Sequence, residues 1–339
     1  MTKSSAPGKI ILFGEHAVVY GRPALAVPVT QVHADVEVSD SSRAGIWINA
    51  PDVNLHAEVN TLPSDHPIAS VIHNLFFLSR TSPSPREASP KGTGRGVRGE
   101  GRFPNLEINI SSTIPVASGL GSGAAVTVAL VRALSSHLNY SMTDEDVNAF
   151  AYDIEKLHHG TPSGIDNTVV TYAKPVYFVR QFPSPLGRGV GGEGKVETFK
   201  AGKPFTIVIG DTGIPAPTKE SVSDVRKLWE ADKEKWESVF DKVGEISFSA
   251  RRVIEEGWVK MLGQLMDENH ALLKEMTVSL PELDQLVEAA RKAGAWGAKM
   301  SGGGRGGNMI ALVEKEKAED VAFALISAGA KRTLITTIS

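Results

Sequence analysis

Short hydrophobic runs and alternating hydrophobic and polar positions mark the strands that this chain predicts. Residues 9–13 and 24–27 are apolar runs of the length of a buried strand. Residues 34–38 and 106–110 alternate apolar and polar side chains, which indicates strands. Further strands are predicted at residues 175–179, 206–209, 296–300 and 309–313 and at the C-terminus.

Helical periodicity appears between these strands and dominates the last third of the chain. One helix is predicted from about Gly119 to His137, and a second, begun by Thr143 and an acidic first turn, reaches about His158. Residues 218–292 are mostly helical, with breaks predicted near Gly244, Gly257 and Pro281. A last helix is expected at about 317–328.

Strands mixed with helices throughout predict an α+β or α/β protein. A chain of 339 residues favours two domains, and the change from strand-rich to helix-rich sequence puts a boundary near residue 200. Two segments rich in Gly, Pro and Arg, at about 81–102 and 183–195, contain the related sequences GRGVRGEG and GRGVGGEG. Such composition cannot build a core, so both are interpreted as insertions without chemistry.

Composition removes several classes of function. Without cysteine, the chain has no disulfide, zinc-thiolate site or thiol nucleophile, and a cytoplasmic location is expected. The net charge of −3 and the absence of a basic face argue against nucleic acid and membrane surfaces as partners. The start of the chain lacks the long apolar run of a secretory signal, and the uncharged stretch 111–131 is too rich in Gly and Ser for a membrane span.

The stretch IPVASGLGSGAA, residues 114–125, is the strongest candidate for chemistry. Glycines before a helix allow backbone N–H groups to surround a phosphate, and the helix dipole adds partial positive charge. No lysine follows Gly123, so this is not the common phosphate loop GxxxxGK[ST]. A glycine-rich turn that only packs a helix would have the same composition.

Three other segments carry polar groups in unusual places. Lys9 begins a buried strand that is followed by Glu15 and His16, although a surface lysine and a capping pair would have the same pattern. Glu155 and Asp166 flank a Pro-Ser-Gly turn, where one carboxylate could bind a metal and the other accept a proton. The alternative for Asp166 is an ordinary turn or helix cap.

The adjacent histidines 158 and 159 do not face the same side of a helix and are not expected to bind a metal. The fourth segment, SGGGRGGN at 301–308, permits close approach of a ligand or forms a flexible hairpin.

The order of PGKIILFGEHAVVYG, IPVASGLGSGAA, GTPSGIDN and KMSGGGRGGN resembles that of the GHMP small-molecule kinases over nearly the whole chain. The resemblance implies a two-domain α+β sandwich, with a domain like ribosomal protein S5 domain 2 at 1–200 and a ferredoxin-like domain at 201–339. It implies transfer of the ATP γ-phosphate, with Mg²⁺, to the C5 hydroxyl of (R)-mevalonate in isoprenoid biosynthesis. A homodimer is expected from the same resemblance.

The resemblance also assigns roles to residues of this sequence. Asp166 matches the catalytic aspartate, and Lys9 matches the lysine beside it. Glu155 matches the magnesium carboxylate. The residues expected near the substrate are Glu15, His16, Thr218 and Gly303. The residues expected at the ATP phosphates are Pro115, Ser118, Gly119, Leu120, Gly121, Ser122, Gly123 and Ala124.

Two positions depart from the family pattern. The usual GLGSSA has a second serine that helps to bind magnesium, and here Gly123 replaces it. Magnesium would then depend on Glu155, ATP oxygens and water, or on Ser122. Arg305 stands where glycine is common and either reaches a phosphate or faces solvent. The alternatives in function are a kinase for phosphomevalonate or for another hydroxyl, and a catalytically silent ligand sensor.

Overall fold

The computed structural model describes residues 1–81, 104–115, 118–159, 162–180, 195–216 and 218–339. These residues form two compact units, each built from segments that are far apart in the sequence. The first unit comprises Met1–Pro7, Val32–Thr113 and Gly123–Pro162. The second comprises Gly8–Gln31, Ile114–Ser122 and Ser163–Ser339. Nearly all of the two predicted insertions, 82–102 and 183–194, lies outside the described residues.

In the first unit, strands pair in the order β4-β3-β5-β2. The strands are β3 (Ile46–Ala50), β4 (Leu55–Glu58), β5 (Leu106–Ser112) and the second half of β2 (Pro23–Asp40). Buried and less buried side chains alternate along β2 and β5, as the sequence predicts for these strands. The helices are α1 (Pro67–Thr81), α2 (Ser122–His137) and α3 (Asp144–His159), with short 3-10 helices η2 (Pro51–Val53) and η3 (Val59–Thr61).

In the second unit, the first half of β2 pairs with β6 (Val176–Val179), and β6 pairs with β7 (Lys195–Thr198). Strand β1 (Thr2–Phe13), which begins in the first unit, pairs with β2. The 3-10 helix η1 (Ala17–Tyr20) and helix α4 (Ile165–Tyr172) lie against these strands. Val18, Ala24 and Phe178 pack with Ile165 and Val169 in one buried cluster, which fixes the start of α4.

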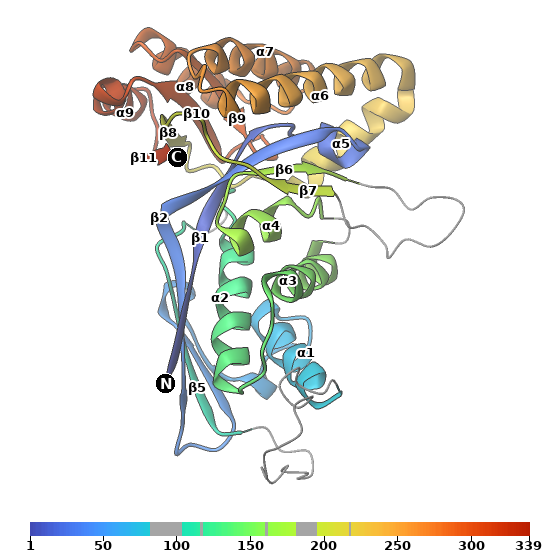
Figure 1. The fold of residues 1–339 in the computed structure, drawn as a ribbon, viewed down its shortest axis with the longest axis vertical. Coiled ribbons are helices and arrows are strands. Elements are labelled where there is room, and N and C mark those ends of the chain that lie inside the picture. The colour runs from blue at the N-terminus through green and yellow to red at the C-terminus, as the bar shows by residue number, and fades with distance from the viewer. Residues whose placement is uncertain (82–103, 116–117, 160–161, 181–194, 217) are drawn as a thin grey trace. The chain divides into compact units, whose positions relative to one another are not determined.

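The second unit also contains a four-stranded antiparallel sheet of order β11-β8-β10-β9. Its strands are β8 (Phe205–Asp211), β9 (Gly297–Ser301), β10 (Asn308–Val313) and β11 (Arg332–Ile338). Figure 1 shows α7, α8 and α9 packed along this sheet, and α6 beside α7. The helices of this part are α5 (Thr218–Ala231), α6 (Lys233–Glu255), α7 (Met261–Glu275), α8 (Pro281–Lys292) and α9 (Ala318–Ser327), with η5 (Lys315–Lys317).

The helix break predicted near Gly244 is wrong, because α6 runs through it from Lys233 to Glu255. A Cβ at Gly244 would lie 3.0 Å from the Cγ of Arg22, so the glycine gives room for a packed side chain. The breaks near Gly257 and Pro281 coincide with the ends of helices. The sequence analysis did not predict β3, β4, β7, α1 or α4, nor the short 3-10 helices.

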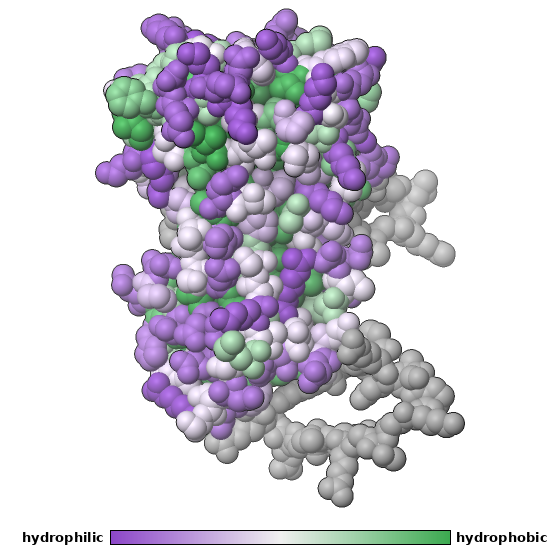
Figure 2. All heavy atoms as spheres, turned by 60° about the vertical axis from the view of Figure 1, so that its left-hand side comes forward, coloured by the Kyte–Doolittle hydropathy of each residue, from purple (hydrophilic) through white to green (hydrophobic). Residues whose placement is uncertain are grey.

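Hydrophilic side chains cover much of the face drawn in Figure 2, and hydrophobic side chains form small separate groups on it. No helix in the described part of the chain is long and apolar enough to cross a membrane.

Candidate active site

The glycine-rich segment before α2 lies against the end of β1 within the second unit. The backbone N–H of Lys9 donates to the carbonyl of Leu120 at 2.9 Å. Gly121 has a φ of +77°, and a Cβ there would lie 2.8 Å from the Cγ of Lys9. A side chain at 121 would therefore clash with Lys9 and strain the backbone, so glycine is needed here for both reasons.

Lys9 forms an ion pair with Asp166, from a segment 157 positions later in the chain. The Lys9 Nζ lies 2.9 Å from Asp166 Oδ1, and the side chains are 5% and 36% exposed. Asp166 is in the first turn of α4, which Gly164 begins with a φ of +87°. Lys9 is thus buried while its partner carboxylate stays accessible from solvent, as proton exchange with a ligand requires.

The C-terminal glycine motif contacts the same segment. The side-chain amide of Asn308 donates to the carbonyl of Ser118. Ser118 in turn donates from its hydroxyl to the carbonyl of Pro115 at 2.8 Å. A Cβ at Gly307 would lie 3.4 Å from the Ser118 carbonyl oxygen. Asn308 and Gly307 therefore contact the glycine-rich segment at Ser118 and restrict its backbone. Sequence reasoning did not single out Asn308.

Glu15 and His16 follow β1 and are both buried. The carboxylate of Glu15 forms an ion pair with Lys299, a residue that sequence reasoning missed. His16 Nε2 donates to the carbonyl of Gly303 at 3.1 Å. Burial, with a smaller contribution from the positive charge of Arg305, lowers the pKa of His16 to about 4, and the hydrogen bond opposes this. His16 is therefore a neutral donor near neutral pH.

Thr218, the exposed first residue of α5, lies against Gly303. A Cβ at Gly303 would approach the Thr218 Oγ1 to 2.7 Å, so only glycine allows this contact. Of the four residues expected near the substrate, His16 and Thr218 both contact Gly303, and Glu15 precedes His16 in the sequence. Arg305 does not simply face solvent, since its guanidinium pairs with Asp224 of α5 at 2.5 Å.

In the first unit, Glu155 of α3 lies near Gly123 at the start of α2. The Glu155 Oε1 is 3.9 Å from the position of a Cβ at Gly123, so a serine there would place its hydroxyl beside this carboxylate. A carboxylate suits Mg²⁺, which keeps several waters and binds substrate phosphates. No group of three or more His, Cys, Asp or Glu among the described residues could bind a metal ion by themselves.

Comparison with known proteins identifies the family in which these features occur. The model of the GHMP kinases N terminal domain matches residues 92–174, and that of the GHMP kinases C terminal domain matches residues 250–331. The mevalonate kinase of Thermococcus gammatolerans is 35% identical over 99% of this chain and 96% of its own length. The chain belongs to the GHMP kinase family.

Other GHMP kinases cover the chain equally well. The mevalonate kinase of Pyrococcus abyssi is 35% identical over 99% of this chain and 95% of its own. The crystal structure of L. major mevalonate kinase in complex with R-mevalonate has a TM-score of 0.80 and 27% identity, covering 100% of this chain and 96% of that one. The predicted two-domain GHMP kinase fold and the predicted enzyme class, an ATP-dependent small-molecule kinase, are confirmed.

Within this GHMP kinase, the structure brings together Lys9 with Asp166, and Glu15 and His16 with Gly303 and Thr218. Gly123, Ala124 and Glu155 belong to the first unit and are described only relative to each other. Lys299 could have been noticed from the sequence, because it is a lysine inside an otherwise apolar run that ends at Met300. Its partner Glu15 lies 284 positions away, which no local pattern reveals.

Proposed function

We propose that this GHMP kinase phosphorylates the C5 hydroxyl of (R)-mevalonate with ATP and produces 5-phosphomevalonate. The names of the relatives that match over nearly the whole chain support this substrate. The observation that carries the proposal is the 2.9 Å pair of Lys9 Nζ and Asp166 Oδ1 beside the glycine-rich loop. A lysine and a carboxylate that share one small space can together activate an alcohol.

In the proposed reaction, the acceptor oxygen forms a bond to the γ-phosphorus while the bond from that phosphorus to the ADP oxygen breaks. Asp166 accepts the hydroxyl proton or orients the hydroxyl, and the Lys9 ammonium stabilises the charge that develops on the oxygen. Phosphoryl transfer depends mainly on such positioning and charge stabilisation. The buried stem of Lys9 and its backbone bond to Leu120 restrict where the ammonium can go.

The ATP phosphates are proposed to bind the loop before α2. Gly119 and Gly121 have φ values of +81° and +77°, a conformation that glycine adopts without strain. The dipole of α2, a helix of 16 residues, favours an anion at its N-terminus. The proposed contacts are Pro115, Ser118, Gly119, Leu120, Gly121, Ser122, Gly123 and Ala124.

Magnesium is proposed to be held by the Glu155 carboxylate, with the Ser122 hydroxyl as the second protein group. When bound with ATP, the ion would neutralise charge on the phosphate oxygens. Gly123 offers no hydroxyl, so this chain would hold the ion with fewer protein oxygens than the usual GLGSSA sequence provides.

The acceptor is proposed to lie against Glu15, His16, Thr218 and Gly303. The neutral His16 ring donates to the Gly303 carbonyl, and Thr218 packs against Gly303. These contacts fix the three residues relative to one another. A homodimer, a cytoplasmic location and the absence of a nucleic-acid partner also stay predictions.

A coupled assay of ADP release with purified protein, MgATP and either mevalonate or phosphomevalonate tests the proposal. ADP release with mevalonate, and a product phosphorylated at C5 by ³¹P and ¹³C NMR, is the expected result. Turnover only with phosphomevalonate, or phosphorylation at another hydroxyl, would reassign the acceptor. Tight binding of mevalonate without any ADP release would identify a ligand sensor.

A further inference from the structure

Lys299 and Glu15 form an ion pair in which both side chains are fully buried, at 0% exposure each. The Lys299 ammonium donates to Glu15 Oε1 and to the Met300 carbonyl, the latter at 2.7 Å. Burial lowers the pKa of Lys299, and the Glu15 charge opposes this effect. Removing two opposite charges from water costs free energy that their attraction repays only with good geometry, so stability alone is a weak reason for such a pair.

The second carboxylate oxygen of Glu15 gives the pair another role. Glu15 Oε2 is buried and has no hydrogen-bond partner among the described residues. A buried polar atom without a partner is costly, and in native proteins it calls for an explanation. A carboxylate oxygen accepts hydrogen bonds, so a hydroxyl of a bound ligand would satisfy it, whereas a ligand carboxylate would be repelled.

The groups around Glu15 are those proposed for the acceptor. His16 follows it in sequence and donates to the Gly303 carbonyl. Ser301, two residues after Lys299, donates from its hydroxyl to the Ile11 carbonyl at 2.7 Å. The end of β1 and the end of β9 are thus joined by side chains on either side of the Lys299–Glu15 pair.

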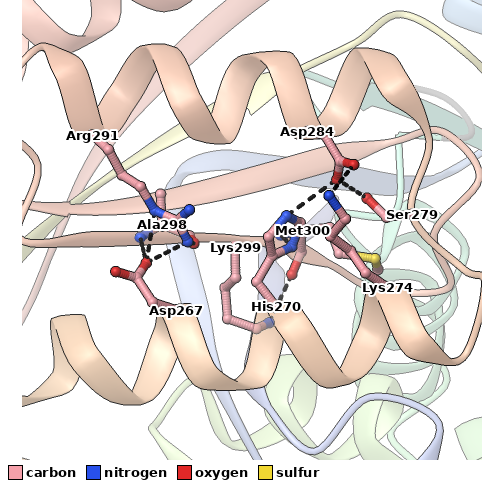
Figure 3. Close-up of polar contacts among 9 residues, drawn as sticks. All are labelled: Asp267, His270, Lys274, Ser279, Asp284, Arg291, Ala298, Lys299 and Met300. Atoms are coloured by element: carbon pink, nitrogen blue, oxygen red, sulfur yellow. Dashed lines mark hydrogen bonds and ion pairs between the residues drawn. The ribbon is translucent and has the colours of Figure 1, made fainter.

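The backbone of β9 is anchored immediately before and after Lys299. The N–H of Ala298 donates to Asp267 Oδ1 at 3.0 Å, and that of Met300 donates to His270 Nδ1 at 3.3 Å. Both acceptors come from α7, and Figure 3 shows them on either side of Lys299. Asp267 is held by Arg291, and His270 Nε2 lies 3.2 Å from Asp284. These contacts restrict the backbone position from which the Lys299 side chain extends.

We propose that Lys299 is a positioning residue for the acceptor alcohol. It holds Oε1 of Glu15 in place, so that Oε2 accepts a hydrogen bond from an acceptor hydroxyl. This assignment rests on the proposed function, since it names which group of the acceptor meets Glu15. Lys299 acts through Glu15 and does not itself touch the reacting atoms.

The effect on KM for mevalonate, set against the effects on kcat and on KM for ATP, separates positioning from a merely structural role. In Lys299→Met, Glu15 Oε1 would lose the ammonium that fixes it, so the orientation of Oε2 toward the acceptor would be lost. The other ionisable groups nearby are His16 beside Glu15, Arg305 facing His16, and His270, which also faces Asp284, Lys274 and Arg291. Burial lowers the pKa of both His16 and His270 to about 4, so neither ring titrates between pH 6 and 8.5.

The experiment measures KM for mevalonate, KM for ATP and kcat from pH 6 to 8.5 in the native chain, Lys299→Met and Lys299→Arg. Lys299→Met should raise KM for mevalonate about 10- to 100-fold at pH 6, as loss of a hydrogen bond to a charged group implies. In the same variant, kcat and KM for ATP should stay close to the values of the native chain. Lys299→Arg should keep most of the affinity and the pH profile of the native chain.

Lys317→Met, at an exposed lysine that pairs with Asp320, is the matched control and should change nothing. If Lys299→Met does not fold, the double variant Glu15→Gln with Lys299→Met removes both buried charges, and it should show a raised KM for mevalonate with an unchanged KM for ATP. A native KM at every pH in Lys299→Met, or in the double variant where only that folds, overturns the assignment. Absence of mevalonate turnover in the native chain overturns the proposed function first, and this assignment with it.

Discussion

Two lysine–carboxylate pairs in the second unit have the same chemistry and opposite surroundings. In the pair of Lys9 and Asp166, the carboxylate is 36% exposed. In the pair of Lys299 and Glu15, neither side chain reaches solvent. Both lysines lie on strands next to a glycine-rich segment, and both receive their partner from a distant part of the sequence.

The difference in exposure separates the tasks that each pair can perform. A carboxylate open to solvent can exchange a proton with a ligand and then with water, so Asp166 suits general base catalysis. A carboxylate fixed by a buried ammonium keeps its orientation, so Glu15 suits a fixed hydrogen bond from its second oxygen rather than proton exchange with water. The predictions below test this division, beginning with the largest expected effect.

Asp166→Asn should lower kcat by about 10²–10⁴-fold, because the amide cannot accept the hydroxyl proton. The affinity for ATP should stay close to that of the native chain, which calorimetric titration would measure beside the coupled assay. Asp320→Asn, at an exposed aspartate of α9, is the control. Near-native turnover in Asp166→Asn would remove its catalytic assignment.

Lys299→Met should lower the free energy of unfolding by about 3–5 kcal/mol, because it removes one partner of an ion pair that is buried on both sides. Lys9→Met should cost about 1 kcal/mol or less through its lost ion pair, since water can reach Asp166. Urea unfolding monitored by tryptophan fluorescence compares the two variants. Equal losses would show that the two pairs do not differ in the way their exposure indicates.

Acid should destabilise the surroundings of the buried pair. His16 and His270 each have a pKa of about 4 in the folded chain, lowered mainly by burial, against 6.5 for an ordinary histidine. Between these values the unfolded chain binds more protons, so the free energy of unfolding is undiminished above pH 6.5 and falls as pH drops toward 4. The difference corresponds to at most about 3 kcal/mol for each histidine.

Urea midpoints measured from pH 4 to 7 would show this loss, and His270→Gln should make the slope smaller. His270 is a suitable probe because it accepts a hydrogen bond from the Met300 N–H and is not proposed to touch the substrate. An unchanged slope in that variant would mean that other groups control the acid stability.

The pair of Arg305 and Asp224 should have the smallest effect, because both side chains are partly exposed, at 26% and 36%. It ties the C-terminal glycine motif to α5, the helix that begins at Thr218. Arg305→Gly should raise KM for mevalonate less than about fivefold, and only at low salt, since salt screens such a pair. Asp224→Asn should raise KM for mevalonate by the same factor, and the double variant should raise it no further. Additive effects of the two substitutions would show that the Arg305–Asp224 ion pair does not act as one unit.

Local pattern determined the elements with strong periodicity. The strands at 106–110 and 309–313 and the helix from Asp144 are where their sequences predict them. It did not find β3 or β4, and it placed a break at Gly244 because glycine usually weakens a helix. The packing of Arg22 against Gly244, which is a tertiary contact, is what the sequence could not show.

By itself, the sequence determined the family and the candidate residues, because glycines, a lysine and carboxylates in a fixed order are required by the chemistry of one site. Only the tertiary structure decided which charges meet. Lys9 and Asp166, like Lys299 and Glu15, are brought together by strands and helices whose packing depends on contacts far apart along the chain. Exposure is also set by that packing, so the different tasks of the two pairs became visible only in the fold.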